Sequence, residues 1–132
     1  MGTIDTFFMF EGKAEEAMNF YVSLFRNSEV LTIERYGPEG PGAEGTVVQA
    51  TFSLNGQQYR CIDSSVKHAF TFTPAISLFV TCDTEEEIDD LFEKLSRGGS
   101  VLMPLDVYPF SRKFAWVADS FGVTWQLSLP NS

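Results

Sequence analysis

Hydrophobic and polar positions along the first half of the chain predict one strand, one helix and three further strands. The apolar run from Ile4 to Phe10 is typical of a buried strand. From Ala14 to Phe25 apolar residues recur at helical spacing, whereas Glu15 and its polar neighbours point the other way. The pair Asn55-Gly56 favours the positive φ angles of a type I′ turn, so we expect a β-hairpin around it. These patterns place a strand at 4–10, a helix at 14–25 and strands at 30–36, 47–54 and 57–62.

The second half repeats this order. Thr84 and Glu87 form the T-x-x-E capping box that marks the start of a helix, and Gly98-Gly99 marks its end. The last two strands are joined by Asp119 to Gly122, which predicts a closing hairpin. These patterns place a strand at 75–82, a helix at 84–95, a short strand around Val101 and strands at 114–118 and 123–129.

Two stretches interrupt the predicted elements. The Gly and Pro residues of 37–45 exclude regular structure, so we expect a mobile loop there. This stretch is not a phosphate-binding loop, because it lacks the motif's Lys and carries Glu39 and Glu44, which repel phosphate. The second interruption, 63–74, is a connector between the halves.

The two halves align directly with one another. Glu15 falls on Glu85, Met18 on Ile88 and Tyr21 on Leu91, so the two helices match in pattern. A half of this size buries little core by itself, whereas two similar halves can share one. We therefore predict one domain over 1–132, made of a module at 3–63 and a module at 74–130.

Composition limits the partners of this chain. Of its 132 residues 44% are hydrophobic, and 18 Asp and Glu against 9 Lys and Arg give a net charge of −9. Such a surface repels phosphate backbones and anionic lipid, which excludes nucleic acid and membrane as expected partners. No apolar run reaches membrane-spanning length, and Met1 to Asp5 lacks the features of a secretory signal. We therefore expect a cytoplasmic protein.

Few residues are candidates for catalysis. Cys61 and Cys82 match no metal-binding spacing and are interpreted as reduced, buried thiols. His68, the one histidine, lies in the connector with no nucleophile placed by the sequence to use it. The acidic run 85–90 is interpreted as the solvated face of the second helix, where negative charge also favours the helix dipole.

Four stretches carry a resemblance to a known family. They are Gly12-Lys13-Ala14-Glu15-Glu16-Ala17, Phe20-Tyr21-Val22-Ser23-Leu24-Phe25, Pro74-Ala75-Ile76-Ser77-Leu78 and Asp119-Ser120-Phe121-Gly122-Val123-Thr124-Trp125-Gln126. Together with the twofold βαβββ order, they resemble the PhnB-like branch of the vicinal oxygen chelate superfamily, often labelled 3-demethylubiquinone 3-methyltransferase. The resemblance implies an α+β fold in which two βαβββ modules form a curved, cup-shaped mixed sheet with the helices outside.

The resemblance also implies where a binding site lies. Metal-dependent relatives place His, Gln or Glu at four positions inside the cup, and the corresponding residues here are Thr6, Gln49, Ser77 and Gln126. Hydroxyls and amides are weak ligands for a divalent metal, so we predict no metal and no cofactor. Trp116 and Tyr108 belong to the closing segment, which lines the cavity in relatives, and complete the predicted ligand-binding set. Alternation puts Trp125 on the face opposite Gln126.

The leading hypothesis is a metal-free protein that binds a small organic molecule, assembled as a homodimer as the resemblance implies. An uncharged polar surface around Gln49 suits a neutral or cationic ligand. A second hypothesis is a metal-dependent glyoxalase or dioxygenase type of enzyme, or acid–base catalysis by groups such as Asp63, Asp106 or Arg60. A third is a drug-sequestering protein. The methyltransferase label lacks support, because no Gly-rich strand-to-helix loop for S-adenosylmethionine is present.

Overall fold

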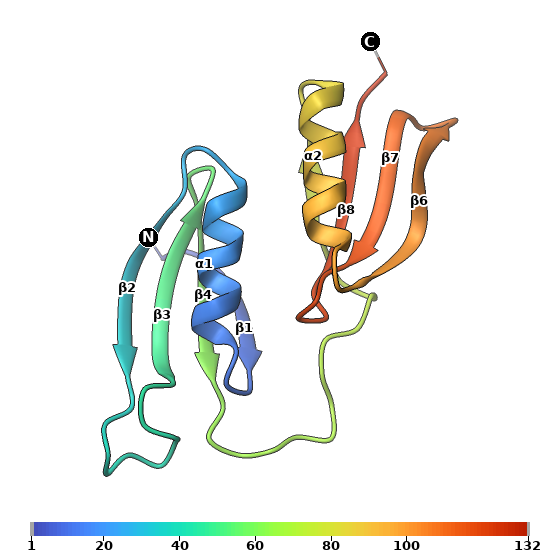
Figure 1. Cartoon of the computed structure of the whole chain (residues 1–132). Helices are drawn as coiled ribbons and strands as arrows, with labels where there is room; N and C mark the ends of the chain where they lie inside the picture. The colour runs from blue at the N-terminus through green and yellow to red at the C-terminus, as the bar shows by residue number, and fades with distance from the viewer. Residues whose placement is uncertain (1, 132) are drawn as a thin grey trace. The chain divides into compact units, whose positions relative to one another are not determined.

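The computed structural model describes residues 2–131 and divides the chain into two compact units, one ending at Ala69 and one beginning at Phe70 (Figure 1). Each unit contains one four-stranded mixed sheet and one helix, so the predicted α+β class and βαβββ order are confirmed. None of the helices among the described residues has the length and apolar character needed to cross a bilayer.

The first unit orders its sheet β1-β4-β3-β2, with β1 parallel to β4 and the other neighbours antiparallel. Its helix covers one face of the sheet, where Tyr21 contacts the rings of Phe8 and Phe52. All three side chains are buried, so the apolar stripe predicted for this helix forms the core of the unit. The elements are β1 (Thr6–Phe10), α1 (Ala14–Leu24), β2 (Glu29–Arg35), β3 (Val47–Leu54) and β4 (Gln57–Asp63).

Asp63 holds the first unit together at the start of α1. Its Oδ1 accepts hydrogen bonds from the backbone N–H groups of Gly12 and Ala14, at 2.8 and 2.9 Å, and its Oδ2 accepts one from Val47 at 2.9 Å. The helix has no cap from its own N-cap residue, Lys13. A carboxylate distant in sequence therefore satisfies the N–H groups that a local cap normally serves.

Two turns of the first unit follow from their glycines. Asn55 and Gly56 have φ angles of 51° and 84°, which confirms the type I′ hairpin. The stretch 37–45 has no helix or strand, as predicted, but it packs on Tyr36. A Cβ added at Gly42 would lie 2.6 Å from that ring, so a larger residue would require the ring to move. Backbone bonds from Tyr36 to Thr46 and from Gly45 to Tyr36 close the loop.

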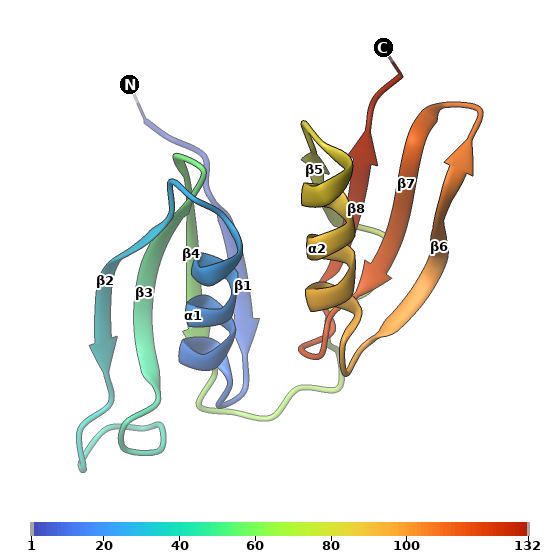
Figure 2. The ribbon, with the colours of Figure 1, turned by 45° about the horizontal axis from the view of Figure 1, so that its top comes forward.

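The second unit has the equivalent order, β5-β8-β7-β6, with β5 parallel to β8. Figure 2 shows β5 beside β8 and behind α2. Ile88, Leu91 and Leu95 of the helix are buried against this sheet, together with Trp125 of β8. The elements are β5 (Ser77–Thr81), α2 (Glu85–Ser96), β6 (Ser100–Tyr108), β7 (Ser111–Ala118) and β8 (Thr124–Leu129).

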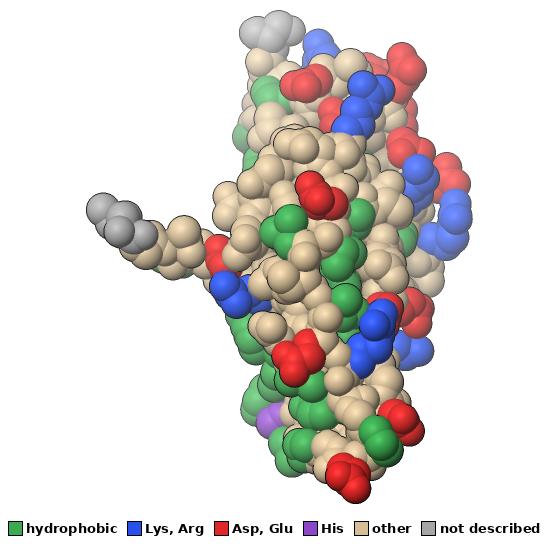
Figure 3. Space-filling model, turned by 90° about the vertical axis from the view of Figure 1, so that its left-hand side faces the viewer, with side chains coloured by type: hydrophobic (Ala, Val, Ile, Leu, Met, Phe, Trp, Pro, Cys, Tyr) green, Lys and Arg blue, Asp and Glu red, His purple; other side chains and the backbone are tan. Residues whose placement is uncertain are grey.

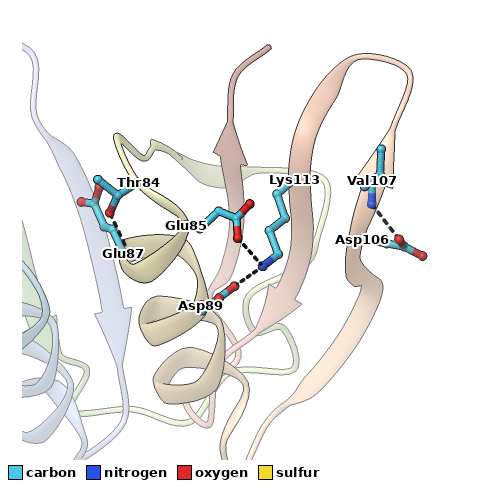
Figure 4. A network of polar contacts seen from close by, with 7 residues as sticks. All are labelled: Thr84, Glu85, Glu87, Asp89, Asp106, Val107 and Lys113. Atoms are coloured by element: carbon cyan, nitrogen blue, oxygen red, sulfur yellow. Dashed lines mark hydrogen bonds and ion pairs between the residues drawn. The ribbon is translucent and has the colours of Figure 1, made fainter. Parts of the chain in front are cut away.

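The predicted cap of α2 is present (Figure 4). Thr84 Oγ1 accepts a hydrogen bond from the backbone N–H of Glu87 at 3.1 Å. The Glu87 carboxylate reaches back to the N–H of Asp83, at 2.7 Å, one residue before the usual partner in a capping box. Farther along the helix, Asp89 accepts from Lys113 of β7 at 2.6 Å, tying α2 to the sheet.

The strand predicted around Val101 is much longer than expected. It is β6, which pairs with β7 as far as Tyr108 despite Pro104 and several register shifts. Proline is tolerated on an edge strand because its missing N–H need not face a partner. The sequence pattern was wrong about this length because Pro104 and Asp106 are uncommon inside strands.

Candidate functional site

Each sheet has one face that no helix of its own unit covers, and we call this its open face. On the second sheet the register pairs Ser77 with Thr124, and it pairs Gln126 with both Phe79 and Trp116. The intervening Trp125 faces α2, so these five side chains lie on the open face by strand alternation. The structure thus brings together three predicted ligand-binding residues, Ser77, Trp116 and Gln126.

A chain of hydrogen bonds fixes Trp116. Its Nε1 donates to Ser77 Oγ at 3.1 Å, and Ser77 Oγ lies 2.6 Å from Thr124 Oγ1. Thr124 Oγ1 donates to the carbonyl of Ile76 at 2.8 Å, so its proton is not available to Ser77. Ser77 therefore donates to Thr124 and accepts from Trp116. The indole ring is held in one orientation on the open face.

Gln126 is the polar group that this arrangement leaves available. Within residues 2–131 its amide makes no hydrogen bond, and it is partly exposed. An amide offers both a donor and an acceptor. Beside it lie the half-buried Trp116 and Phe79, which is 60% exposed. The surface can therefore stack against a planar group and form hydrogen bonds at that group's edge.

Tyr108 lies at the tip of the β6–β7 hairpin. Its ring stacks on Phe110, with centroids 5.5 Å apart, and meets Phe114 edge to face at 5.8 Å. Its hydroxyl donates to the carbonyl of Pro104 at 2.7 Å. Phe114 is two residues from Trp116 on β7 and shares its face. Tyr108 thus extends the aromatic surface, but within residues 2–131 no hydrogen bond joins it to Ser77 or Gln126.

The first sheet holds the two remaining predicted residues, on opposite faces. Gln49 shares the open face with Thr51, as expected, and is exposed. Thr6 pairs with Tyr59 and alternates with the buried Phe8, so it lies on the side that α1 covers. Thr6 therefore lies on the face opposite Gln49 and not on the open face that the resemblance implied. A one-residue shift in transferring the position reverses the face, and Phe7 occupies the open face instead.

The open face of the first sheet also carries charge, contrary to the expected uncharged surface. Arg60 pairs with Phe7 and with Thr51, which places it on this face. Its Nε donates to the carboxylate of Asp5 at 3.0 Å. The open face of the first sheet is thus not uniformly neutral.

The donor chemistry does not fit a metal. Among residues 2–131 no three His, Cys, Asp or Glu side chains gather in an arrangement that could hold an ion. Ser77 has its proton and one lone pair engaged, and Gln126 offers a single neutral oxygen. A divalent metal requires imidazole, thiolate or carboxylate ligands to offset its desolvation. We derive no chemistry through a metal from these residues.

Three groups considered for acid–base or nucleophilic catalysis form hydrogen bonds with other groups of the chain. Asp63 is buried and serves three backbone N–H groups, while Asp106 accepts from the N–H of Val107 (Figure 4). His68 Nε2 lies 2.9 Å from Ser64 Oγ, a neighbour that the sequence did not indicate. That hydroxyl also bonds the backbone of Val66, as in a side-chain-stabilised turn.

The two thiols are buried, as predicted. Burial, with a smaller effect of the Asp63 carboxylate, raises the pKa of Cys61 to about 12. Burial, with smaller effects of Glu87 and Asp83, raises the pKa of Cys82 to about 12. Neither thiol supplies a thiolate nucleophile near neutral pH.

Sequence reasoning missed Thr124 and Phe79 as members of the site, and it named Arg60 only as a candidate for acid–base catalysis. Alternation along β8 from Gln126 identifies Thr124, and alternation along β5 from Ser77 identifies Phe79. The pairing of β1 with β4 identifies Arg60 only after Phe7, rather than Thr6, is placed on the open face. The internal repeat contained this information, because the alignment that pairs Glu15 with Glu85 also pairs Phe7 with Ser77.

A family model and a solved structure each match nearly the whole chain. A family model described as 3-demethylubiquinone-9 3-methyltransferase matches residues 2–128. A solved structure from Bacillus cereus, described as a putative 3-demethylubiquinone-9 3-methyltransferase, PhnB protein, is 65% identical and has a TM-score of 0.95. The match covers 97% of this chain and 99% of that chain. No curated protein matches the chain.

More distant structures share the fold. A glyoxylase/bleomycin resistance protein/dioxygenase domain from Frankia sp. EAN1pec is 14% identical with a TM-score of 0.68, covering 100% of this chain and 93% of that one. The fosfomycin resistance protein FosX from Listeria monocytogenes, solved with Mn(II) and sulfate, is 12% identical with a TM-score of 0.64. That match covers 98% of this chain and 90% of the other. At such identity the likeness concerns the fold alone.

Proposed function

The chain belongs to the PhnB-like family described as 3-demethylubiquinone-9 3-methyltransferase, within the vicinal oxygen chelate superfamily, and we propose that it binds a small organic molecule without a metal. The open face of the second sheet is the proposed binding surface. The observation that carries this proposal is the fixed Trp116 ring beside the unbonded amide of Gln126. A flat ring and a free amide together suit a neutral, planar ligand with a polar edge.

The family description is not the function that we propose. A doubly wound methyltransferase binds its cofactor at a Gly-rich turn between a parallel strand and a helix. Here the turn before α1 is Glu11-Gly12-Lys13 and the turn before α2 is Cys82-Asp83-Thr84. Neither turn offers the glycines that admit a cofactor's phosphates or carboxylate to the backbone. Both sheets are mixed rather than parallel.

Titration of the isotopically labelled chain with benzamide and nicotinamide tests the proposal. Both probes are planar, neutral and amide-bearing. We expect chemical-shift changes at the Trp116 indole N–H and at the backbone amides of Ser77 and Gln126. Gln126→Leu removes the free amide and is expected to weaken binding about tenfold, equivalent to one net hydrogen bond. Gln57→Leu is the matched control, because Gln57 is exposed at the start of β4, and it should bind as the wild type does.

Two results would count against this function. The first is the absence of shifts at Trp116 and Gln126 at millimolar probe. The second is a stoichiometric divalent metal in chain purified without chelator, measured by elemental analysis, which would favour the metal-dependent enzyme.

For homodimerisation, light scattering behind a sizing column measures the mass directly against the 14.8 kDa of one chain.

A further inference from the structure

A buried carboxylate positions Arg60 on the open face of the first sheet. The Asp5 side chain is 8% exposed, and its Oδ2 accepts hydrogen bonds from Arg60 Nε at 3.0 Å and from Gln58 Nε2 at 2.8 Å. The Arg60 side chain is 47% exposed. One end of the guanidinium is therefore anchored against the sheet, while the rest of the group is accessible to solvent.

The anchoring leaves the two terminal nitrogens of Arg60 unused. Its bond to Asp5 passes through Nε, and within the described part of the chain Nη1 and Nη2 bond to no other residue. The terminal nitrogens present parallel N–H donors, which match the two oxygens of a carboxylate. A guanidinium held at its inner nitrogen loses less side-chain entropy when it binds such a group.

The neighbours of Arg60 determine which other groups a bound carboxylate would contact. Register places Phe7 on one side of it and Thr51 on the other. Phe7 is 55% exposed, so an apolar ring lies open to solvent beside the cation. The Thr51 hydroxyl is already bonded to Thr32 at 2.7 Å and offers little to a ligand. Glu34, which pairs with Gln49 on the same face, adds a negative charge at the sheet edge.

We propose that Arg60 and Phe7 form a binding site for the carboxylate of a small organic acid with an apolar body. The terminal nitrogens of Arg60 hold the carboxylate and the Phe7 ring contacts the apolar part. Asp5 already neutralises much of the cation and the whole chain carries a net charge of −9, so a singly charged carboxylate suits the site better than a dianionic phosphate. This site belongs to the first unit, whereas the neutral surface proposed above belongs to the second.

Benzoate, which is anionic at neutral pH, and benzamide, its neutral counterpart of the same shape, distinguish this site in the intact labelled chain. Benzoate is expected to shift the backbone amides of Phe7 and Arg60 and the Arg60 Nε–H resonance, and benzamide is expected to leave them unchanged. Equal shifts with both probes, or none with benzoate, would overturn the proposal. Shifts at Trp116 report the other surface, so the two proposals fail separately.

Substitution tests the role of the guanidinium. Arg60→Gln removes the charge and should weaken benzoate binding at least tenfold. Arg60→Lys keeps the charge but loses the paired N–H donors of the guanidinium, so its binding should be intermediate. Arg26→Gln, at an exposed position just after α1, is the matched control and should bind as the wild type does. Wild-type affinity for benzoate in Arg60→Gln or in Arg60→Lys would contradict binding of the carboxylate by the paired N–H donors of Arg60. Should Arg60→Gln fail to fold, the two-probe comparison in the wild type still decides.

Discussion

Asp63 of the first unit and Asp119 of the second are buried residues whose carboxylate oxygens accept hydrogen bonds from other groups of the chain. Asp63 serves three backbone N–H groups at the start of α1. Asp119 accepts from the backbone of Phe121 and Val123, at 2.9 and 3.1 Å, and from the Trp125 indole at 2.9 Å. Hydrogen bonds to a charged acceptor are stronger than neutral ones, and a buried donor that loses its acceptor is costly. Asp63 and Asp119 therefore have structural roles.

Asp119→Asn is therefore expected to destabilise the chain by roughly 2–3 kcal/mol. An amide offers a single acceptor oxygen, and its NH₂ group would face N–H groups that now donate to the carboxylate. Chemical denaturation followed by circular dichroism measures the free energy of unfolding. Asp90→Asn is the control, since among residues 2–131 Asp90 pairs only with Lys94, on an exposed helix face, and it should cost less than about 1 kcal/mol. Equal losses in the two variants would contradict the role given to Asp119.

The thiols provide a second prediction at this scale. Because burial raises the pKa of Cys61 and Cys82 to about 12, from an ordinary 9.0, the folded chain should resist thiol reagents at pH 8. The unfolded chain loses these protons first as pH rises, so the free energy of unfolding should fall above about pH 9. Absorbance with an aromatic disulfide reagent measures both thiols, native and in guanidinium. Rapid labelling of native protein would show that the burial is wrong.

Residue-level prediction from sequence succeeded where alternation was continuous. Ser77, Gln126 and Trp125 lie on the faces expected of them. It failed for Thr6, because the position was transferred by distance across the β1–α1 turn, where one residue reverses the face. It also missed the anchoring of Arg60, since Asp5 and Arg60 are brought together only by the parallel pairing of β1 with β4.

At the scale of elements, local signals predicted ends and turns better than lengths. The Thr84 cap and the Asn55-Gly56 turn were predicted from adjacent residues and are confirmed. The cap of α1 was not predictable in this way, because its acceptor, Asp63, lies at the end of β4. The length of β6 was underestimated because pairing with β7 overrides the poor strand propensity of Pro104.

The junction between α2 and β6 gives a prediction for this scale. A Cβ added at Gly99 would lie 2.0 Å from the carbonyl oxygen of Ala118, a backbone atom that cannot move without shifting β7. Gly99→Ala is expected to destabilise by about 2 kcal/mol or more, as overpacking does. Gly37→Ala, where no atom lies within 4 Å of the added Cβ, should stay within about 0.5 kcal/mol of the wild type. Thermal unfolding compares the two, and similar melting temperatures would contradict the close approach at Gly99.

At the scale of the whole chain, the repeated βαβββ order yields two units whose open faces differ in chemistry. The second sheet presents Trp116 and Gln126, a neutral surface, and the first presents Arg60 with Phe7. The repeat predicted the shared topology but not this difference, because equivalent positions hold unrelated side chains. On the surface viewed in Figure 3, acidic and basic side chains lie next to one another at several places, and hydrophobic side chains are exposed elsewhere on the same surface.

The central claim is that a planar organic molecule binds beside Trp116 and Gln126 without a metal. The most direct measurement is the dissociation constant for benzamide, read from the Trp116 indole N–H resonance, in chelator-treated chain and again with added Zn²⁺. We expect saturable shifts with the same dissociation constant in both samples. Shifts that appear only with the metal present would contradict it.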